Sequence, residues 1–451
     1  MGDKRLIINI ELKAREFAIL AHKGQIRKSD PEKPMIIHPI NVAQILKQYG
    51  FDENVIAAGY LHDVVEDTSY TTNDIKNKFG DDIVSLVSGA SEPDKSLSWE
   101  ERKKHTIEET KKLDLRHKSI ICADKISNLE DLQILFEIKG EYDFSAFKRG
   151  FDKQKWYYEE VYNSLIFNED ENHHMFVRLK ELIDYIFNDK KDDDYVKNVI
   201  FENNLNEYLK LKKIHYRKEE VYKLKKVLSK QNPYVIEFTG TPRTGKTSLI
   251  NNLKDFFKKK GFSVEILEEF TTSEKYKKEI YPTLKDKYKN VVNTEIPKYV
   301  LKQLEESITN NPDIIIVDRS LFDRLIWVDR LVLKNGMSNE EYNDYKNKYI
   351  PLIKEKIDIV IATYTNSITA LKRDYNANLS LEKRNFLNET NVEEYNKSLL
   401  NMEKLASIGK INFKMFDTTN KNQREISFEV IDYILKDMRE NLLNKVKKEF
   451  N

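Results

Sequence analysis

The segment from Tyr234 to Phe257 constrains the fold of this chain more than any other. It begins with an apolar run, Tyr234–Thr239, whose length and composition are those of a buried strand. The glycine-rich run 240–247, GTPRTGKT, follows, and a helical stretch comes after it. Strand, loop and helix in this order match GxxxxGK[ST] in its required context. The segment therefore predicts an α/β domain whose loop binds phosphate.

Each part of this loop has an expected role in binding a nucleoside triphosphate. Two glycines, Gly240 and Gly245, let the backbone approach phosphate closely, and Lys246 reaches the outer phosphates. The hydroxyl of Thr247 is placed to hold magnesium, and the helix N-terminus favours an anion. We therefore predict ATP and Mg²⁺ as ligands, with ATP in contact with Gly240, Thr241, Pro242, Arg243, Thr244, Gly245, Lys246 and Thr247.

Four further apolar runs predict the remaining strands of a doubly wound parallel sheet. They are Ser263–Leu267, Asp313–Asp318, Ile357–Thr363 and Ile411–Phe416, with helical stretches between them. Ligands bind at the carboxyl ends of such strands. The polar residues at the ends of the second and third predicted strands are Glu268, Glu269, Asp318, Arg319 and Ser320.

A second group of chemically active residues lies in the N-terminal half, in the run LHDVVEDT at Leu61–Thr68. Residues four apart share a face of a helix, so one continuous helix would stack the histidine–aspartate pair on the glutamate–aspartate pair. A histidine upstream, in MIIHP, and an aspartate downstream, in ADKISNL, add to this set. Two imidazoles and two carboxylates suit a divalent ion such as manganese or iron. The predicted metal ligands are His38, His62, Asp63 and Asp124.

The neighbours of these acids predict that the helix is buried, because Ala57, Ala58 and Leu61 are apolar. Buried carboxylates need partners. We therefore expect Glu66 and Asp67 to accept a proton from, or to orient, a water molecule that attacks a phosphate ester. The alternative is an acidic helix face in contact with solvent.

The first 188 residues resemble the hydrolase domain of RelA/SpoT-type alarmone enzymes and their small single-domain relatives. The resemblance rests on AREFAILAHKGQIRK, IIHPINVAQIL, IAAGYLHDVVEDT, FGDDIVSLVSGASEP and ADKISNLEDL. It implies an all-helical domain that uses one manganese ion to remove the 3′-pyrophosphate from guanosine tetra- and pentaphosphate; some animal relatives dephosphorylate NADPH. It also implies a nucleotide pocket lined by Arg27, Lys28 and Asn128. Two acids depart from the family pattern, and we expect Asp30 and Glu32 near the base pocket.

From about Asn232 to Phe450 the chain resembles P-loop nucleoside and nucleotide kinases, including deoxynucleoside kinases. The resemblance rests on the phosphate-binding loop, on VDRSLFDRLIW and on the arginine-bearing LKRDYNANLSLEKRNF. It implies that Glu269 is the base for the acceptor hydroxyl, with Glu268 as the second candidate. It also implies that Arg319 binds substrate or phosphate.

Three further residues of this half have two interpretations each. The resemblance makes Arg373 and Arg384 a lid over the transferred phosphoryl group, because the planar guanidinium matches phosphate. Their alternative is ordinary surface charge. Asp318 either belongs to the kinase motif or is the Walker B aspartate of an ATPase switch.

Composition narrows the classes of partner and compartment. The formal net charge of the 451 residues is +1 and a third of them are charged, which gives no hint of a nucleic-acid or membrane surface. The single cysteine, Cys122, excludes an internal disulfide and fits a reducing cytoplasm. No apolar run approaches the roughly 20 residues of a membrane span, and the N-terminus lacks a signal-peptide pattern. We expect a cytoplasmic protein whose partners are small-molecule nucleotides.

Together these features predict a multidomain chain. An all-α HD-type metal-dependent phosphohydrolase domain covers residues 1–188, a helical connector 189–231, and an α/β P-loop domain 232–451. Our hypothesis is a bifunctional enzyme that hydrolyses guanosine 3′,5′-bis(diphosphate), or a related nucleotide, and phosphorylates a nucleoside or nucleotide with ATP. In the alternative hypothesis the P-loop domain senses ATP or GTP and gates the hydrolase.

Overall fold

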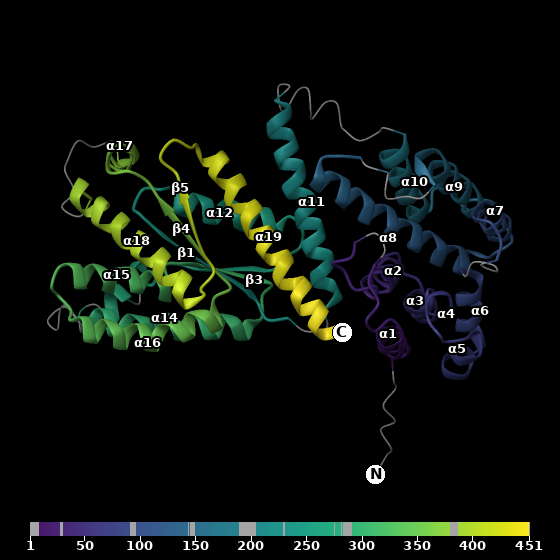
Figure 1. Cartoon of the computed structure of the whole chain (residues 1–451), viewed down its shortest axis with the longest axis horizontal. Coiled ribbons are helices and arrows are strands. Elements are labelled where there is room, and N and C mark those ends of the chain that lie inside the picture. The colour runs from purple at the N-terminus through teal and green to yellow at the C-terminus, as the bar shows by residue number, and fades with distance from the viewer. Residues whose placement is uncertain are drawn as a thin grey trace, which may run out of the picture. The chain divides into compact units, whose positions relative to one another are not determined.

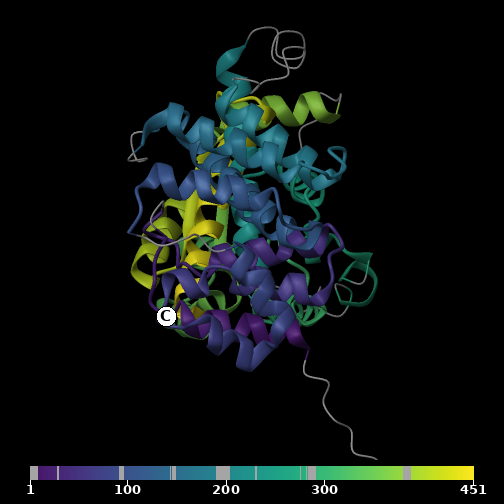
Figure 2. The same cartoon turned by 90° about the vertical axis from the view of Figure 1, so that its right-hand side faces the viewer.

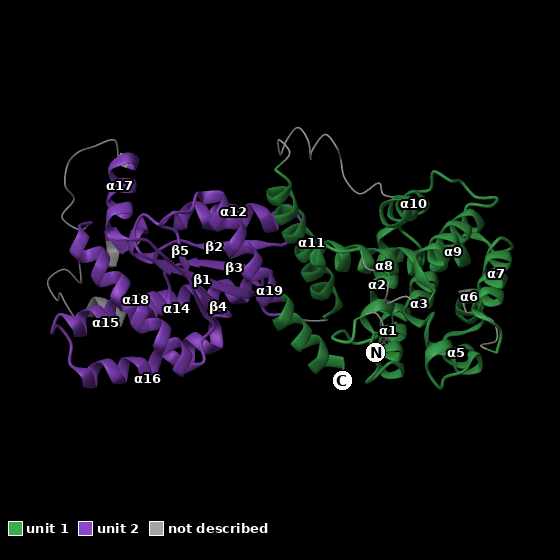
Figure 3. Cartoon of the chain, turned by 45° about the horizontal axis from the view of Figure 1, so that its top comes forward, with its two compact units in different colours: residues 1–229, 439–451 green, residues 230–438 purple. Residues whose placement is uncertain are grey.

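The computed structural model describes residues 9–27, 30–90, 96–142, 144, 149–188, 204–228, 231–274, 276–280, 282, 291–378 and 387–450. The chain divides into two compact units (Figure 3). Unit 1 consists of residues 1–229 and 439–451, and unit 2 of residues 230–438. The boundaries at 188 and 231 remain predictions; residues 439–451 group with the N-terminal unit.

The regular structure of unit 1 is helical throughout its described part (Figures 1 and 2). Its long central helix α8 packs against α2, α3, α6, α9, α10 and α11. The prediction of an all-helical N-terminal domain is confirmed. The helices are α1 (Ile10–Ala21), α2 (Ile37–Gln48), α3 (Glu53–Leu61), α4 (Val64–Asp67), α5 (Thr72–Phe79), α6 (Asp81–Ala90), α7 (Trp99–Thr110), α8 (Leu115–Lys139), α9 (Gly150–Leu165), α10 (His174–Phe187) and α11 (Leu205–Val227).

The segment with the histidine–aspartate pair departs from the expected single helix. Helix α3 ends at Leu61 and α4 begins at Val64, so His62 and Asp63 lie between two helices. The Nδ1 atom of His62 lies 2.9 Å from the carbonyl oxygen of Gly59. Because a carbonyl only accepts, the imidazole donates, and it ends α3 by binding a carbonyl of the last turn. The prediction of one continuous helix through this segment was therefore wrong.

Unit 2 is built on a parallel five-stranded sheet in the order β2-β3-β1-β4-β5. The five predicted strands are all present, with boundaries that shift by one or two residues. The central strand β1 lies between β3 and β4, so the chain crosses in opposite directions on either side of it and leaves a crevice at the carboxyl ends. The strands are β1 (Tyr234–Gly240), β2 (Val264–Leu267), β3 (Ile314–Asp318), β4 (Ile359–Tyr364) and β5 (Phe413–Asp417).

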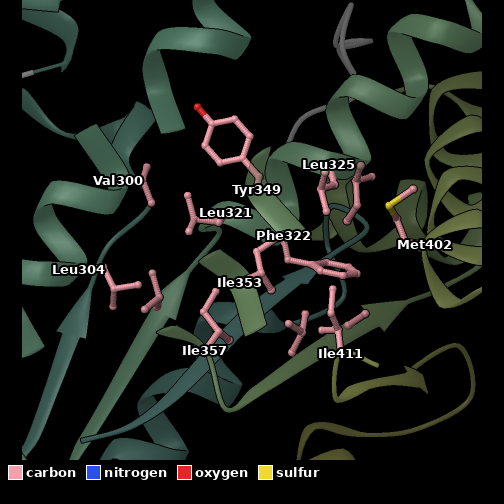
Figure 4. Packing of buried hydrophobic residues seen from close by; sticks show 14 of the residues in the cluster. Val300, Leu304, Leu321, Phe322, Leu325, Tyr349, Ile353, Ile357, Met402 and Ile411 are labelled. Carbon is pink, nitrogen blue, oxygen red and sulfur yellow. The ribbon is translucent and has the colours of Figure 1, made fainter. Parts of the chain in front are cut away.

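Helices cover both faces of this sheet (Figure 1). On one face α14, α15, α16 and α18 bury a large apolar cluster against the strands, with Phe322 between Leu321 and Met402 (Figure 4). Helix α12 packs on β1, β2 and β3 and contributes none of its described residues to that cluster, so it covers the other face. The bounds are α12 (Lys246–Lys258), η2 (Phe270–Thr272), η3 (Tyr276–Ile280), α14 (Val291–Asn310), α15 (Leu321–Leu333), α16 (Asn339–Lys356), α17 (Ser367–Asn378), α18 (Glu389–Gly409) and α19 (Gln423–Phe450). Among the described residues, no helix has both the length and the apolar character to cross a membrane.

Candidate functional sites

Three side chains of unit 1 form a cluster that could hold a metal ion, and each comes from a different element. His38 lies in the first turn of α2, His62 follows α3, and Asp124 lies on α8. One potential ligand atom from each lies within 4.8 Å of the others. Asp63 borders the cluster, with its carboxylate oxygens 3.6 Å from His38 Nε2 and 3.2 Å from His62 Nε2. The fold thus brings together the four residues predicted as ligands.

The two imidazoles are arranged as metal ligands usually are. Each has one nitrogen next to an outer partner, which is the Gly59 carbonyl for His62 and the Ser127 hydroxyl, at 3.1 Å, for His38. The Nε2 atom of His62 is buried and has no hydrogen-bond partner among the described residues. An outer hydrogen bond that fixes the ring while the other nitrogen faces the site is typical of ligating histidines. The donor set therefore fits a divalent cation.

Electrostatics favour the protonation states that bind metal. Burial lowers the pKa of His38, and the nearby charge of Arg27 lowers it further. Burial raises the pKa of Asp124, but Lys125 and the hydrogen bond with His38 outweigh this and hold that pKa well below its usual range. A neutral imidazole and an ionised carboxylate are the forms that coordinate a cation.

A row of polar residues on α8 leads from the metal cluster to Arg27. The Asn128 amide donates to Asp124 Oδ1 at 2.7 Å, and Arg27 donates to Asn128 at 3.3 Å and to Asp131 at 3.2 Å. Burial raises the pKa of Asp131, but Lys223 and Arg27 bring it to about 2. Sequence reasoning missed Asp131, although its spacing of seven from Asp124 places both on one helix face.

The remaining predicted residues of this half are placed differently. Glu66 is half-buried one turn after His62, whereas Asp67 is exposed, so the expectation that both acids are buried was wrong for Asp67. Asp67 is the last residue of the four-residue helix α4. Lys28 lies outside the described residues.

The phosphate-binding loop of unit 2 has the geometry that its glycines require. Gly240 has a φ of 139°, and a Cβ atom there would lie 2.0 Å from the carbonyl oxygen of Thr363 on β4. Gly245 has a φ of 83° directly before α12. Lys246 begins α12 and pairs with Asp318 at the end of β3. Burial lowers the pKa of Lys246, and the charge of Arg319 adds to this.

Two cavities of unit 2 share part of their lining, which includes one ion pair. The larger, of about 1150 Å³, is lined by the phosphate-binding loop, and Thr247, Asp318 and Glu268 are also among its lining residues. The smaller, of about 600 Å³, is lined in part by aromatic side chains. Glu269 and Arg319 line both cavities and form an ion pair at 3.4 Å. An acid and a cation thus lie where the contents of the two cavities would meet.

Arg319 is held in place by residues that sequence reasoning missed. Its backbone is left-handed, with a φ of 62°, a strained conformation for a residue other than glycine. Its guanidinium donates to the Gly240 carbonyl at 3.0 Å and to Asp323 at 3.1 Å. Asp323 is fully buried and also accepts from Tyr395 at 3.0 Å. Burial raises the pKa of Asp323, but the charges of Arg319 and Arg324 lower that pKa to about 2.

The other predicted residues near the loop have structural partners. Ser320 is buried, and its backbone N–H donates to Glu237 in the middle of β1 at 2.7 Å. Arg373 lines the larger cavity and donates to the carbonyl oxygen of Thr418 at 2.6 Å. Arg384 lies outside the described residues.

Comparison with known proteins finds a family-model match in each half of the chain. A family model of the HD domain matches residues 14–139, and one of an AAA domain matches residues 235–410. The guanosine-3′,5′-bis(diphosphate) 3′-pyrophosphohydrolase MESH1 of Drosophila melanogaster is 43% identical over 121 residues, which cover 26% of this chain and 67% of that protein. The Xenopus tropicalis protein of the same name is 42% identical over 125 residues, 27% of this chain and 69% of that protein. The chain belongs to this pyrophosphohydrolase family.

The HD-domain match includes His38, His62, Asp63 and Asp124. An HD domain implies a bound divalent metal, so this member of the pyrophosphohydrolase family is expected to bind one. The P-loop domain implies a nucleotide with magnesium. Among solved structures, deoxyadenosine kinase from M. mycoides is 23% identical to this chain, with 45% of this chain and 98% of that chain covered and a TM-score of 0.33.

Proposed function

We propose that the chain is a bifunctional nucleotide-metabolising enzyme of the cytoplasm. Unit 1 hydrolyses guanosine 3′,5′-bis(diphosphate), or a closely related nucleotide, with manganese. Unit 2 transfers a phosphoryl group from ATP to a nucleoside or nucleotide. The buried Nε2 of His62, which makes no hydrogen bond and lies beside His38 and Asp124, supports the first activity, in a chain whose relatives are named for that hydrolysis.

In the proposed hydrolase, His38, His62, Asp63 and Asp124 hold the cation. When bound, a divalent cation supplies activation of water and screening of phosphoryl charge. Glu66, half-buried one turn after His62, accepts the proton of the attacking water or orients it. Arg27, fixed by Asn128 and Asp131, presents a planar guanidinium to phosphate.

In the proposed kinase, the larger cavity holds ATP and the smaller one holds the acceptor. Lys246 binds the outer phosphates, and Thr247 and Asp318 hold magnesium. The acceptor oxygen bonds to the γ-phosphorus as the bond to the β–γ bridging oxygen breaks, and Glu269 takes the acceptor proton. Arg319 stabilises the transferred group. The wall that both cavities share at Glu269 and Arg319 supports transfer, because a nucleotide sensor needs only one cavity.

The hydrolase is tested by incubating the full chain and manganese with guanosine 3′,5′-bis(diphosphate). Chromatography should show GDP and pyrophosphate, and EDTA should stop the reaction. Turnover of NADPH but not of the alarmone would change the substrate and keep the metal site.

The kinase is tested by incubating a panel of nucleosides and nucleoside monophosphates with labelled ATP. A labelled phosphorylated product is expected. Saturable ATP binding with no product from any acceptor would instead favour the sensor hypothesis.

A further inference from the structure

The segment before α2 determines where two residues of the hydrolase site lie. Ile26 and Pro34 form an antiparallel bridge, and the Arg27 N–H donates to the Lys33 carbonyl at 2.9 Å. After the bridge, the His38 N–H donates to the Met35 carbonyl at 3.1 Å. Movement of residues 30–34 would therefore displace Arg27 through the bridge, whereas His38 is also held by Ser127 of α8.

The two acids of this segment each pair with a cation. Asp30 lies 3.2 Å from Lys33, and Glu32 accepts a hydrogen bond from Arg439 at 2.9 Å. Their expected place near the base pocket stays a prediction, and both acids also pair with cations. Arg439 belongs to unit 1, although it lies on the last helix of the chain.

A second nitrogen of the Arg439 guanidinium binds another carboxylate. Its Nε donates to Glu220 of α11 at 2.9 Å, and the same Glu220 oxygen lies 2.9 Å from Lys33. The Glu220 side chain is only 7% exposed, so its charge depends on these partners. Without Arg439, Asp30 and Glu220 would share Lys33, and Glu32 would lose its ion pair with Arg439.

Further contacts dock the end of α19 in unit 1. The Arg15 guanidinium of α1 lies over the Phe450 ring at 5.8 Å, and the same side chain donates to the Val227 carbonyl at 2.8 Å. Phe450 and Val446 are buried. Arg439 is therefore held from a fixed helix rather than from a loose chain end.

We propose that Arg439 is a positioning residue of the hydrolase, an inference that rests on the hydrolase function proposed above. By binding Glu32 and Glu220 at once, it holds the segment 30–34 so that Arg27 meets the substrate phosphate. The HD model ends at residue 139, so the match to the family does not include this arginine.

The test compares full-length Arg439→Gln with Lys448→Gln, because Lys448 is an exposed cation on the same helix. In the manganese-loaded protein, Arg439→Gln should raise KM for guanosine 3′,5′-bis(diphosphate) roughly tenfold or more. The kcat and the manganese affinity should change little, since no ligand is altered. Arg439→Lys should restore part of the loss, because it returns the charge but not the two-sided hydrogen bonding. Lys448→Gln should match the wild type.

Hydrogen–deuterium exchange supplies a readout that needs no substrate. The amides of Arg27 and Met35 should exchange faster in Arg439→Gln than in Lys448→Gln. Equal exchange and equal KM in the two variants would overturn the inference, as would joint loss of manganese binding and kcat, which would indicate general unfolding. If the wild type fails to hydrolyse the alarmone, the proposed function fails, and the exchange comparison alone decides the role of Arg439.

Discussion

At the scale of single residues, the clearest functional mark in unit 1 is the buried Nε2 of His62, which makes no hydrogen bond although an Asp63 carboxylate oxygen lies 3.2 Å away. A buried polar atom without a hydrogen bond costs free energy that a bound ligand can recover. The same scale explains Arg319 and Asp323 in unit 2, where a buried carboxylate fixes a strained arginine between two cavities. The two predictions at this scale concern His62 and Glu269, the carboxylate that pairs with Arg319.

His62→Ala should abolish manganese binding and lower hydrolase turnover by about a hundredfold or more. The reason is that alanine removes a buried imidazole nitrogen that makes no hydrogen bond and lies among the other potential ligand atoms. Isothermal titration with manganese and a pyrophosphate-release assay measure both effects. His105→Ala, at an exposed histidine of α7, is the control and should change neither. Near-normal, EDTA-sensitive turnover in His62→Ala would refute the ligand assignment.

Glu269→Gln should leave ATP affinity unchanged and lower phosphoryl transfer by roughly a hundredfold or more, because the amide cannot accept the acceptor proton. Equilibrium ATP binding and product formation from a working acceptor are measured side by side. Glu268→Gln is the matched comparison, since Glu268 is exposed and lines only the larger cavity. If Glu268→Gln loses transfer and Glu269→Gln keeps it, the base is Glu268.

At the scale of elements, the metal cluster depends on how closely α2 and α3 approach. Gly59 allows this approach, because a Cβ atom there would lie 2.6 Å from Leu46 Cδ1 and 3.2 Å from the Cα of Ala43. The Gly59 carbonyl also fixes the His62 ring. The packing of two helices thus sets the distance between His38 and His62.

Gly59→Ala should therefore destabilise unit 1 by about 1–3 kcal/mol through overpacking. It should also weaken manganese binding, because α3 must shift away from α2. Urea unfolding with and without manganese measures both effects. Gly409→Ala at the end of α18 is the control, since a Cβ there meets only ordinary contacts, the shortest at 3.5 Å. Unchanged manganese affinity in Gly59→Ala would contradict the proposed dependence on helix packing.

At the scale of the whole molecule, each proposed site draws its described residues from a single unit. The partners of Lys246 lie in unit 2, whereas the metal cluster and Arg439 lie in unit 1. Among the described helices and strands, α19 alone contributes residues to both units, with Gln423 lining the larger cavity and Arg439 in unit 1. The two chemistries should therefore be separable by substitution.

Lys246→Ala should weaken ATP binding at least about tenfold, because it removes the mobile positive charge at the outer phosphates. Hydrolase kcat and KM should remain at wild-type values. Labelled-ATP binding and alarmone hydrolysis are assayed on the same preparation, and Lys254→Ala, which alters another lysine lining the cavity outside the loop motif, serves as the control. A large loss of hydrolase activity in Lys246→Ala would show that the sites are coupled.

Local pattern was sufficient to predict a large part of this protein. Apolar runs predicted the five strands, because the pattern of apolar side chains reflects the geometry of a single buried strand. The helical first half was predicted from the resemblance of its motifs to a known family. The phosphate-binding loop was predicted from residue types at short spacing. The metal residues are distant in the chain, and their prediction came from the ligand chemistry of their side chains and from the family resemblance.

Only the tertiary structure decided the rest. The break at His62, the buried partners Asp131 and Asp323, the strand order and the joint role of Glu269 and Arg319 all depend on which elements pack together. The contact of Arg439 with Glu32 joins residues far apart in the chain and leaves no periodic trace in either segment. Local sequence sets which face of an element is buried, whereas the pairing of polar groups across elements is fixed only once those faces meet.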